Sequence, residues 1–141
     1  MSIIKYSNTG GGLPMIIVNM FKSLSDENRL RIMNLLIRDE LCVCEIEVIL
    51  ELSQSNVSRH LNKLKSDKMI DFHKKAQWVH YFASDYLKKD KANLYQLLQE
   101  ETEKIPQCME DVRRLNAYKD SHLTCESIRQ DKEAVWEIIR K

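Results

Sequence analysis

Apolar residues recur at helical spacing over most of the chain. Between Pro14 and Leu24 they fall at intervals of three and four residues, and the segment from Leu30 to Ile37 repeats this pattern. Such spacing gathers apolar side chains on one face of an α-helix. Ser25 precedes two acidic residues, which favours it as the N-cap of the second helix. The sequence therefore predicts two amphipathic helices joined by a short turn.

A helix-turn-helix pattern follows. A short third helix is predicted from about Cys42 to Leu50, and Leu52–Ser53 breaks it. Ser53 is a favourable N-cap for a fourth helix that begins near Gln54. The apolar stripe of this fourth helix consists of Val57, Leu61 and Leu64. A short helix, a tight turn and a polar-faced helix in this order are typical of a helix-turn-helix motif.

The period then changes from helical to extended. Ile70–His73 and Trp78–Phe82 are rich in residues that favour strands, and a polar turn, Lys74–Gln77, separates them. This pattern predicts a β-hairpin with a basic tip, a wing. The helical period returns from about Asp85 to Ile105, and residues 112–141 are predicted to be helical as well.

The composition agrees with a mostly α-helical domain that carries a small β-hairpin. The chain has 141 residues but only 3 Gly and 2 Pro, too few for an all-β or loop-rich protein. We expect a flexible N-terminal arm over residues 1–12, a winged helix-turn-helix domain with flanking helices over 13–110, and a helical C-terminal extension over 111–141. No apolar run reaches the roughly 18 residues of a membrane span. We therefore expect a cytoplasmic protein with no membrane partner.

The basic charge is concentrated in the predicted fourth helix, the candidate reading helix that would contact DNA bases, and in the wing. The whole chain has a net charge of +1, but six basic and two acidic residues between Ser53 and His80 leave +4 there. Gln, Asn and Arg side chains can pair with base edges, and Lys attracts phosphates without reading sequence. An ordinary solvated face is the alternative interpretation. The candidate DNA-contacting residues are Gln54, Ser55, Asn56, Ser58, Arg59, His60, Lys63, Lys74, Lys75 and Gln77.

The thiols are the other candidate chemistry. Four cysteines stand at positions 42, 44, 108 and 125, and reduced thiols that lie close together are ligands or redox sensors. Thiolates favour soft metals and, by the same reasoning, trivalent arsenic and antimony. Positions i and i+2 of a regular helix point about 200° apart, so we expect Cys42 and Cys44 to bind one ion only if the helix start distorts. The alternative is that both are small buried apolar residues.

Four ordered segments carry a family resemblance. Leu24–Ile32, Glu40–Ile46, Leu52–Leu61 and Gln77–Tyr81 resemble the ArsR/SmtB family of metal-responsive repressors, and within it the arsenical-resistance repressors. The resemblance implies a dimeric winged-helix fold whose first and post-wing helices form the dimer interface. It also implies that the metal-free homodimer binds double-stranded operator DNA. Release follows when As(III) or Sb(III) binds the thiolates of Cys42 and Cys44.

The sequence departs from the family pattern at two positions. Ala76 stands where the wing turn usually has glycine, and Glu47 stands where the arsenical type often has a third cysteine. Cys108 and Cys125 are the candidates for a third ligand, from the same subunit or its partner. The family's zinc site on the post-wing helix needs histidines, and Asp85–Ile105 contains none.

Three alternative functions share the fold. The inducer can be another soft metal, such as cadmium, lead or zinc, or the thiols can respond to oxidation. The chain can also be a winged-helix scaffold protein that binds no ligand. An enzyme is disfavoured, because no cysteine lies in an anion-binding loop and no nucleophile elbow, phosphate loop or carboxylate pair is recognisable.

Overall fold

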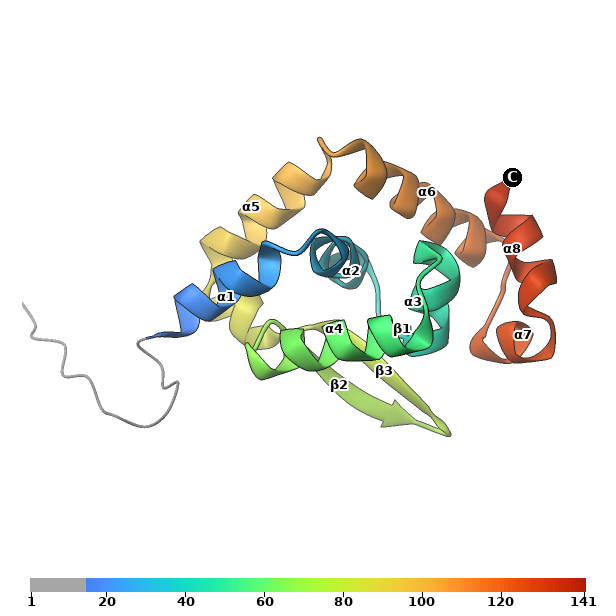
Figure 1. Ribbon diagram of the computed structural model, residues 1–141, viewed down its shortest axis with the longest axis horizontal. Helices are drawn as coiled ribbons and strands as arrows, with labels where there is room; N and C mark the ends of the chain where they lie inside the picture. The colour runs from blue at the N-terminus through green and yellow to red at the C-terminus, as the bar shows by residue number, and fades with distance from the viewer. Residues whose placement is uncertain (1–14) are drawn as a thin grey trace, which may run out of the picture.

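A computed structural model describes residues 15–141 (Figure 1). The expected flexible arm, residues 1–12, lies outside the described residues. The elements follow in the order α1 (Ile16–Leu24), α2 (Glu27–Arg38), β1 (Leu41–Cys42), α3 (Val43–Leu50), α4 (Gln54–Ser66), β2 (Ile70–Lys75), β3 (Trp78–Ala83), a π-helical turn (Tyr86–Asp90), α5 (Ala92–Thr102), α6 (Pro106–Asp120), α7 (Cys125–Gln130) and α8 (Lys132–Arg140). The predicted mostly helical winged fold is confirmed.

The helix-turn-helix consists of α3 and α4. The backbone at Glu51 ends α3 in the left-handed region, with φ 56°. The Ser53 hydroxyl oxygen accepts the backbone N–H of Asn56 at 3.3 Å, so Ser53 caps α4 as predicted. At α2, however, the cap is Asp26, whose carboxylate accepts the N–H of Arg29 at 3.0 Å. Ser25 ends α1 instead, and its expected capping role is wrong.

The wing is an antiparallel hairpin within a three-stranded sheet. The strand order is β1-β3-β2, and the register places Leu41 opposite Tyr81 and Cys42 opposite His80. Ala76 occupies the turn with φ 57°, a conformation that glycine adopts more easily. The predicted hairpin is confirmed, whereas β1 lies where the sequence predicted the start of a helix. This short strand places residue 42 beside His80 of β3 in the wing.

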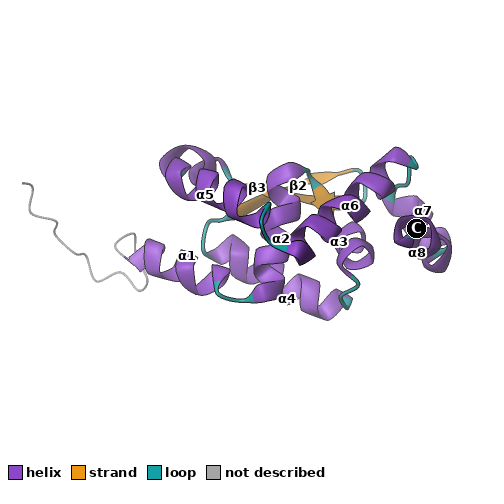
Figure 2. Cartoon of the chain, turned by 90° about the horizontal axis from the view of Figure 1, so that it is seen from above, coloured by secondary structure: helices purple, strands orange, loops and turns teal. Residues whose placement is uncertain are grey.

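One hydrophobic core joins the helix-turn-helix and the C-terminal extension. Fully buried side chains come from α1 to α4 and also from α8, where Ile139 has no exposed surface. These side chains include Met20, Ile32, Met33, Leu35, Ile46, Ile49, Leu61 and Leu64, and they are joined by Met69 after α4 and Leu87 of the π-helical turn. In Figure 2, α1 lies at one end of the molecule and α7 and α8 at the other. The boundary expected at residue 110 falls inside α6, which packs on both α2 and α3.

Polar contacts fix the extension to the carboxyl end of α3. The indole N–H of Trp136 donates to the carbonyl oxygen of Val48 at 3.0 Å. Arg114 forms an ion pair with Glu51, the C-cap of α3, at 3.2 Å. The indole and this guanidinium partner oxygens at the end of α3, where the last backbone carbonyls have no partner within the helix. On α6, the buried carboxylate of Asp111 pairs with Arg31 of α2 at 2.8 Å. Within residues 15–141, no helix has the length and apolar character that a membrane crossing requires.

Candidate metal centre and nucleic-acid interface

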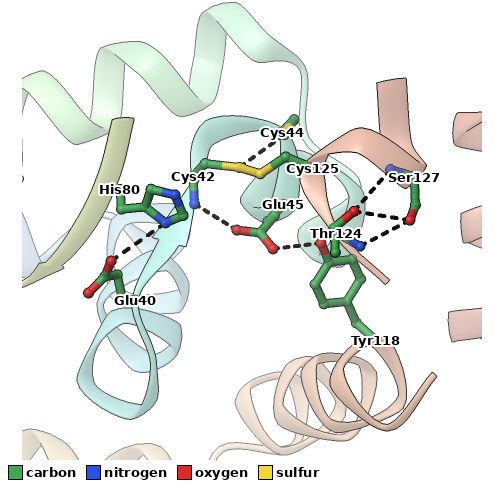
Figure 3. Close-up of a disulfide and its surroundings, with 9 residues drawn as sticks. All are labelled: Glu40, Cys42, Cys44, Glu45, His80, Tyr118, Thr124, Cys125 and Ser127. Carbon is green, nitrogen blue, oxygen red and sulfur yellow. Dashed lines mark hydrogen bonds and ion pairs between the residues drawn. A yellow bond between two sulfur atoms is a disulfide. The ribbon is translucent and has the colours of Figure 1, made fainter. Parts of the chain in front are cut away.

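Three cysteine sulfurs meet beside the wing (Figure 3). Cys42 ends β1, Cys44 is the second residue of α3, and Cys125 is the first residue of α7. The Sγ atoms of Cys42 and Cys44 are 3.0 Å apart, and Cys42 is joined to Cys125 by a disulfide. All three sulfurs lie within 4.8 Å of one another. Cys42 and Cys125 are buried and Cys44 is partly exposed, so the cluster has one open side.

The backbone at Cys42 explains how the sulfurs converge. Cys42 is the N-cap of α3 with extended torsion angles, φ −88° and ψ 169°. It therefore lies outside the helix, and the 200° separation of positions i and i+2 does not apply. The expectation that joint binding requires distortion of the helix start is wrong, because the sulfurs of Cys42 and Cys44 already face each other.

A buried carboxylate holds this backbone in place. The backbone N–H of Cys42 donates to Oε1 of Glu45 at 2.9 Å, and the hydroxyl of Tyr118 donates to Oε2 at 2.5 Å. Burial and the hydrogen bond to Glu45 raise the pKa of Tyr118, so its hydroxyl remains a donor. Glu45 thus links the cysteine segment to α6.

The charges around the open side disfavour the thiolate of Cys44. Burial, followed by the charges of Glu45 and Glu47, raises the pKa of Cys44 to about 11. Glu47 forms an ion pair with Lys132 of α8 at 3.7 Å. Burial raises the pKa of Glu47, and the Lys132 charge opposes that rise. Cys44 is therefore a protonated thiol at neutral pH.

The structure distinguishes the two candidates for a third ligand. Cys125 lies in the sulfur cluster, whereas Cys108 is buried on α6 and is not part of the group. The backbone oxygen of Cys108 instead accepts a hydrogen bond from the side chain of Asn34 at 3.1 Å. No sequence spacing could have indicated the choice, because 83 residues separate Cys42 from Cys125.

A pocket of about 630 Å³ connects the sulfurs to the predicted DNA-contacting elements. Cys42, Cys44 and Cys125 line it together with residues of α7, of the wing tip and of the start of α4. Those other lining residues include Ile128 and Arg129, Gln77 and Trp78, and Gln54. A ligand on the sulfurs would therefore lie where these three elements meet.

Most of the predicted DNA-contacting residues lie on an exposed surface. Nine of the ten candidates occupy α4 or the wing with side chains that are exposed or, for Ser58, partly exposed. Arg59 donates a hydrogen bond to the Asn56 side chain at 3.2 Å, so these two polar groups lie side by side. The exposed first turn of α4 and the basic wing tip can both be presented to a duplex.

His60 is the exception among the ten. Its side chain is 2% exposed, because position 60 belongs to the same face of α4 as Val57 and Leu64. The imidazole Nδ1 lies 3.3 Å from a guanidinium nitrogen of Arg29, and burial lowers the pKa of His60. The expectation that His60 contacts DNA is wrong; the residue packs between α2 and α4.

The wing carries a polar cluster that no sequence pattern indicates. A carboxylate oxygen of Glu40 lies 2.5 Å from Nε2 of His73 and 3.6 Å from Nδ1 of His80. The two histidines are opposite each other across the hairpin. Only the strand register, which puts His73 beside His80, could have indicated this contact between the wing and the segment before β1.

The fold and the exposed polar helix define a winged helix-turn-helix DNA-binding protein. Residues 26–71 match the model of the bacterial regulatory protein, arsR family. The arsenical resistance operon repressor of Escherichia coli K12 is 34% identical over 110 residues, which cover 77% of this chain and 94% of that protein. The chain belongs to the arsR family of bacterial regulatory proteins.

Two further relatives show how far the likeness extends. The cadmium resistance transcriptional regulatory protein CadC of Listeria innocua is 51% identical over 63 residues, 44% of this chain and 53% of that protein. The matched region thus spans about half the length of CadC. The solved structure of HlyU from Vibrio cholerae is 34% identical, with a TM-score of 0.55, and covers 62% of this chain and 91% of that one.

Proposed function

We propose that this protein is a transcriptional repressor that binds double-stranded operator DNA as a homodimer and is released when As(III) or Sb(III) binds Cys42 and Cys44. The observation that carries the proposal is the convergence of these two sulfurs, 3.0 Å apart, beside β3 of the wing. Cys42 pairs with β3 of the wing and also caps α3, which packs on the reading helix α4. A ligand on this residue therefore acts on both DNA-contacting elements.

The local charge supports a trivalent metalloid over a divalent metal. Arsenous acid, As(OH)₃, exchanges each hydroxyl for a protein thiol with loss of one water, so no proton is released and the product is neutral. A divalent cation must displace the thiol protons and leaves an anionic complex when three thiolates bind it. The raised pKa of Cys44 and the neighbouring Glu45 and Glu47 make such an anion costly.

The apolar surface of α1 supports a homodimer. Ile17, Val18 and Phe21 are 36%, 38% and 57% exposed, and Met15 just before the helix is 50% exposed. Leu97 on α5 is also 50% exposed. Large apolar side chains gathered on one element mark an interaction surface. A second copy of the chain that covers α1 and α5 would leave α4 and the wing of each subunit free for DNA.

The proposed DNA interface consists of the nine exposed candidates. Gln54, Ser55, Asn56, Ser58 and Arg59 on α4 contact base edges, and Lys63, Lys74, Lys75 and Gln77 contact the backbone. We place the protein in the cytoplasm, where DNA is present and thiols are kept reduced. Its activity is binding and release, without a catalytic step.

Fluorescence anisotropy on a duplex selected from random sequence tests this function. Arsenite added to the complex of the reduced protein should restore the anisotropy of free DNA. Cys42→Ser and Cys44→Ser should bind the duplex normally and fail to release it, and Cys108→Ala serves as the matched cysteine control. If both serine variants still release the duplex at the arsenite concentration that releases it from the wild type, the proposal is contradicted.

A redox-responsive repressor is the second candidate, and the disulfide between Cys42 and Cys125 favours it. In this case a peroxide converts one thiol to a sulfenic acid with loss of water, and the second thiol displaces another water to form the disulfide. Peroxide, without arsenite, would then release DNA from the wild type but not from Cys125→Ser. If arsenite releases DNA and peroxide does not, the redox candidate is excluded.

A further inference from the structure

We propose that Cys125 supplies the third thiolate to the metalloid, so that the site is completed within one subunit and α7 is joined to the DNA-contacting elements by the bound ligand. This inference rests on the proposed function and extends it to the C-terminal extension, residues 111–141. It assigns the extension a direct part in sensing.

The position of Cys125 is fixed by local hydrogen bonds. The hydroxyl of Thr124 accepts the N–H of Ser127 at 3.3 Å, and the Ser127 hydroxyl accepts the N–H of Thr124 at 3.1 Å (Figure 3). This reciprocal capping box sets the first turn of α7. Cys125 is the first residue of that turn, so its sulfur is presented to β1 and α3 by an ordered backbone.

The extension is held in place by contacts that do not involve sulfur. Trp136 donates to the carbonyl oxygen of Val48, Lys132 pairs with Glu47, and Ile139 is fully buried. The guanidinium of Arg140 also donates to Glu51 at 2.8 Å. These contacts keep α7 beside α3 of the same chain when the disulfide is reduced. They give Cys125 a high effective concentration at the other two sulfurs.

Three sulfurs match the valence of a trivalent metalloid. A cellular thiol first reduces the disulfide: Cys42 and Cys125 each gain one electron and one proton, and two small thiols become one disulfide. Arsenous acid then exchanges its three hydroxyls for three cysteine sulfurs and releases three waters. Cys125 supplies the third sulfur from α7, 83 residues after Cys42 in the sequence.

The pocket connects this third ligand to DNA binding. Ile128 and Arg129 of α7 line it together with Gln77 and Trp78 of the wing and Gln54 at the start of α4. A bond from the metalloid to Cys125 makes the distance between the wing and the reading helix α4 depend on the position of α7. A ligand that favours one spacing over another shifts the DNA-binding equilibrium.

X-ray absorption at the arsenic edge on the reduced, full-length dimer counts the bound sulfurs. The wild type should show three sulfur neighbours, and Cys125→Ser should show two sulfurs and one oxygen. Cys125→Ser should also bind arsenite about tenfold more weakly or worse, while Cys108→Ala matches the wild type. Arsenite should protect Cys125 of the unmutated chain from alkylation by iodoacetamide, which makes the test independent of the folding of the variant.

Mixed dimers distinguish the source of the third sulfur. A subunit with Cys42→Ser and Cys44→Ser is paired with a Cys125→Ser subunit. If Cys125 acts within its own chain, no three-sulfur site forms in the mixed dimer. A three-sulfur site in this dimer, or three sulfurs in Cys125→Ser, would overturn the inference. Absence of arsenite binding by the wild type would instead contradict the proposed function itself.

Discussion

Removal of the Tyr118 hydroxyl tests whether the C-terminal extension is part of one cooperative fold. Tyr118 is 2% exposed, and its hydroxyl donates to the buried carboxylate of Glu45 at 2.5 Å. A hydrogen bond to a charged group contributes roughly 1.5–3 kcal/mol. Tyr118→Phe keeps the ring and leaves one carboxylate oxygen without this donor, so we expect a loss of about 2 kcal/mol.

Urea unfolding of the reduced protein, followed by far-UV circular dichroism, measures this loss. With a slope of about 2 kcal/mol per molar urea, the midpoint falls by about 1 M while the slope stays constant. Tyr95→Phe is the matched control, because Tyr95 is partly exposed. It should change stability by less than about 0.5 kcal/mol. A loss below about 0.5 kcal/mol in Tyr118→Phe would refute the assigned role of this hydrogen bond.

Three further predictions concern assembly, ligand chemistry and DNA. Phe21→Asp places a charge on the exposed face of α1 and should shift the dimer to monomers in analytical ultracentrifugation. The control is Met109→Asp on α6, where the wild-type Met109 side chain is 47% exposed; this variant should remain dimeric. Because Cys44 is protonated below about pH 11, cadmium affinity measured by calorimetry should rise about tenfold per pH unit for each proton released between pH 6 and 8. Arsenite affinity should stay constant over the same range, because protonated thiols exchange with the hydroxyls of arsenous acid without release of a proton. A rise as steep as that of cadmium would contradict this exchange. Lys74→Ala should weaken binding to DNA of every sequence and reduce the slope of log affinity against log salt concentration by about one. Arg59→Ala should lose about 1–3 kcal/mol of binding free energy on the selected duplex only. Equal losses on all sequences would show that Arg59 does not contact base edges.

The elements that were predictable have strong local signals. The period of apolar residues and the Ser53 cap located α4, and the change to alternating β-forming residues located the wing. The same helical period would also have identified His60 as buried, since it lies three residues after Val57 and four before Leu64. The polar imidazole alone favours a DNA contact, whereas the position of His60 on the helix predicts burial.

The sulfur cluster depends on contacts that a linear sequence does not specify. Cys42 leaves the helix because two residues pair with β3, and a two-residue strand has no periodicity of its own. Cys125 reaches the site because Trp136 and Ile139 dock on α3, although 83 residues separate it from Cys42. The choice between Cys108 and Cys125 therefore required the packing of three helices on one another.

The most direct test of the account is the mutual dependence of arsenite and DNA binding in the reduced wild-type dimer. Arsenite affinity is measured with and without saturating selected duplex, and DNA affinity with and without saturating arsenite. Because coupling between two ligands is reciprocal, the two ratios must agree, at a coupling of about 1–3 kcal/mol that weakens each ligand in the presence of the other. Arsenite affinity that is identical with and without DNA would contradict the claim that the thiols of Cys42 and Cys44 control DNA binding.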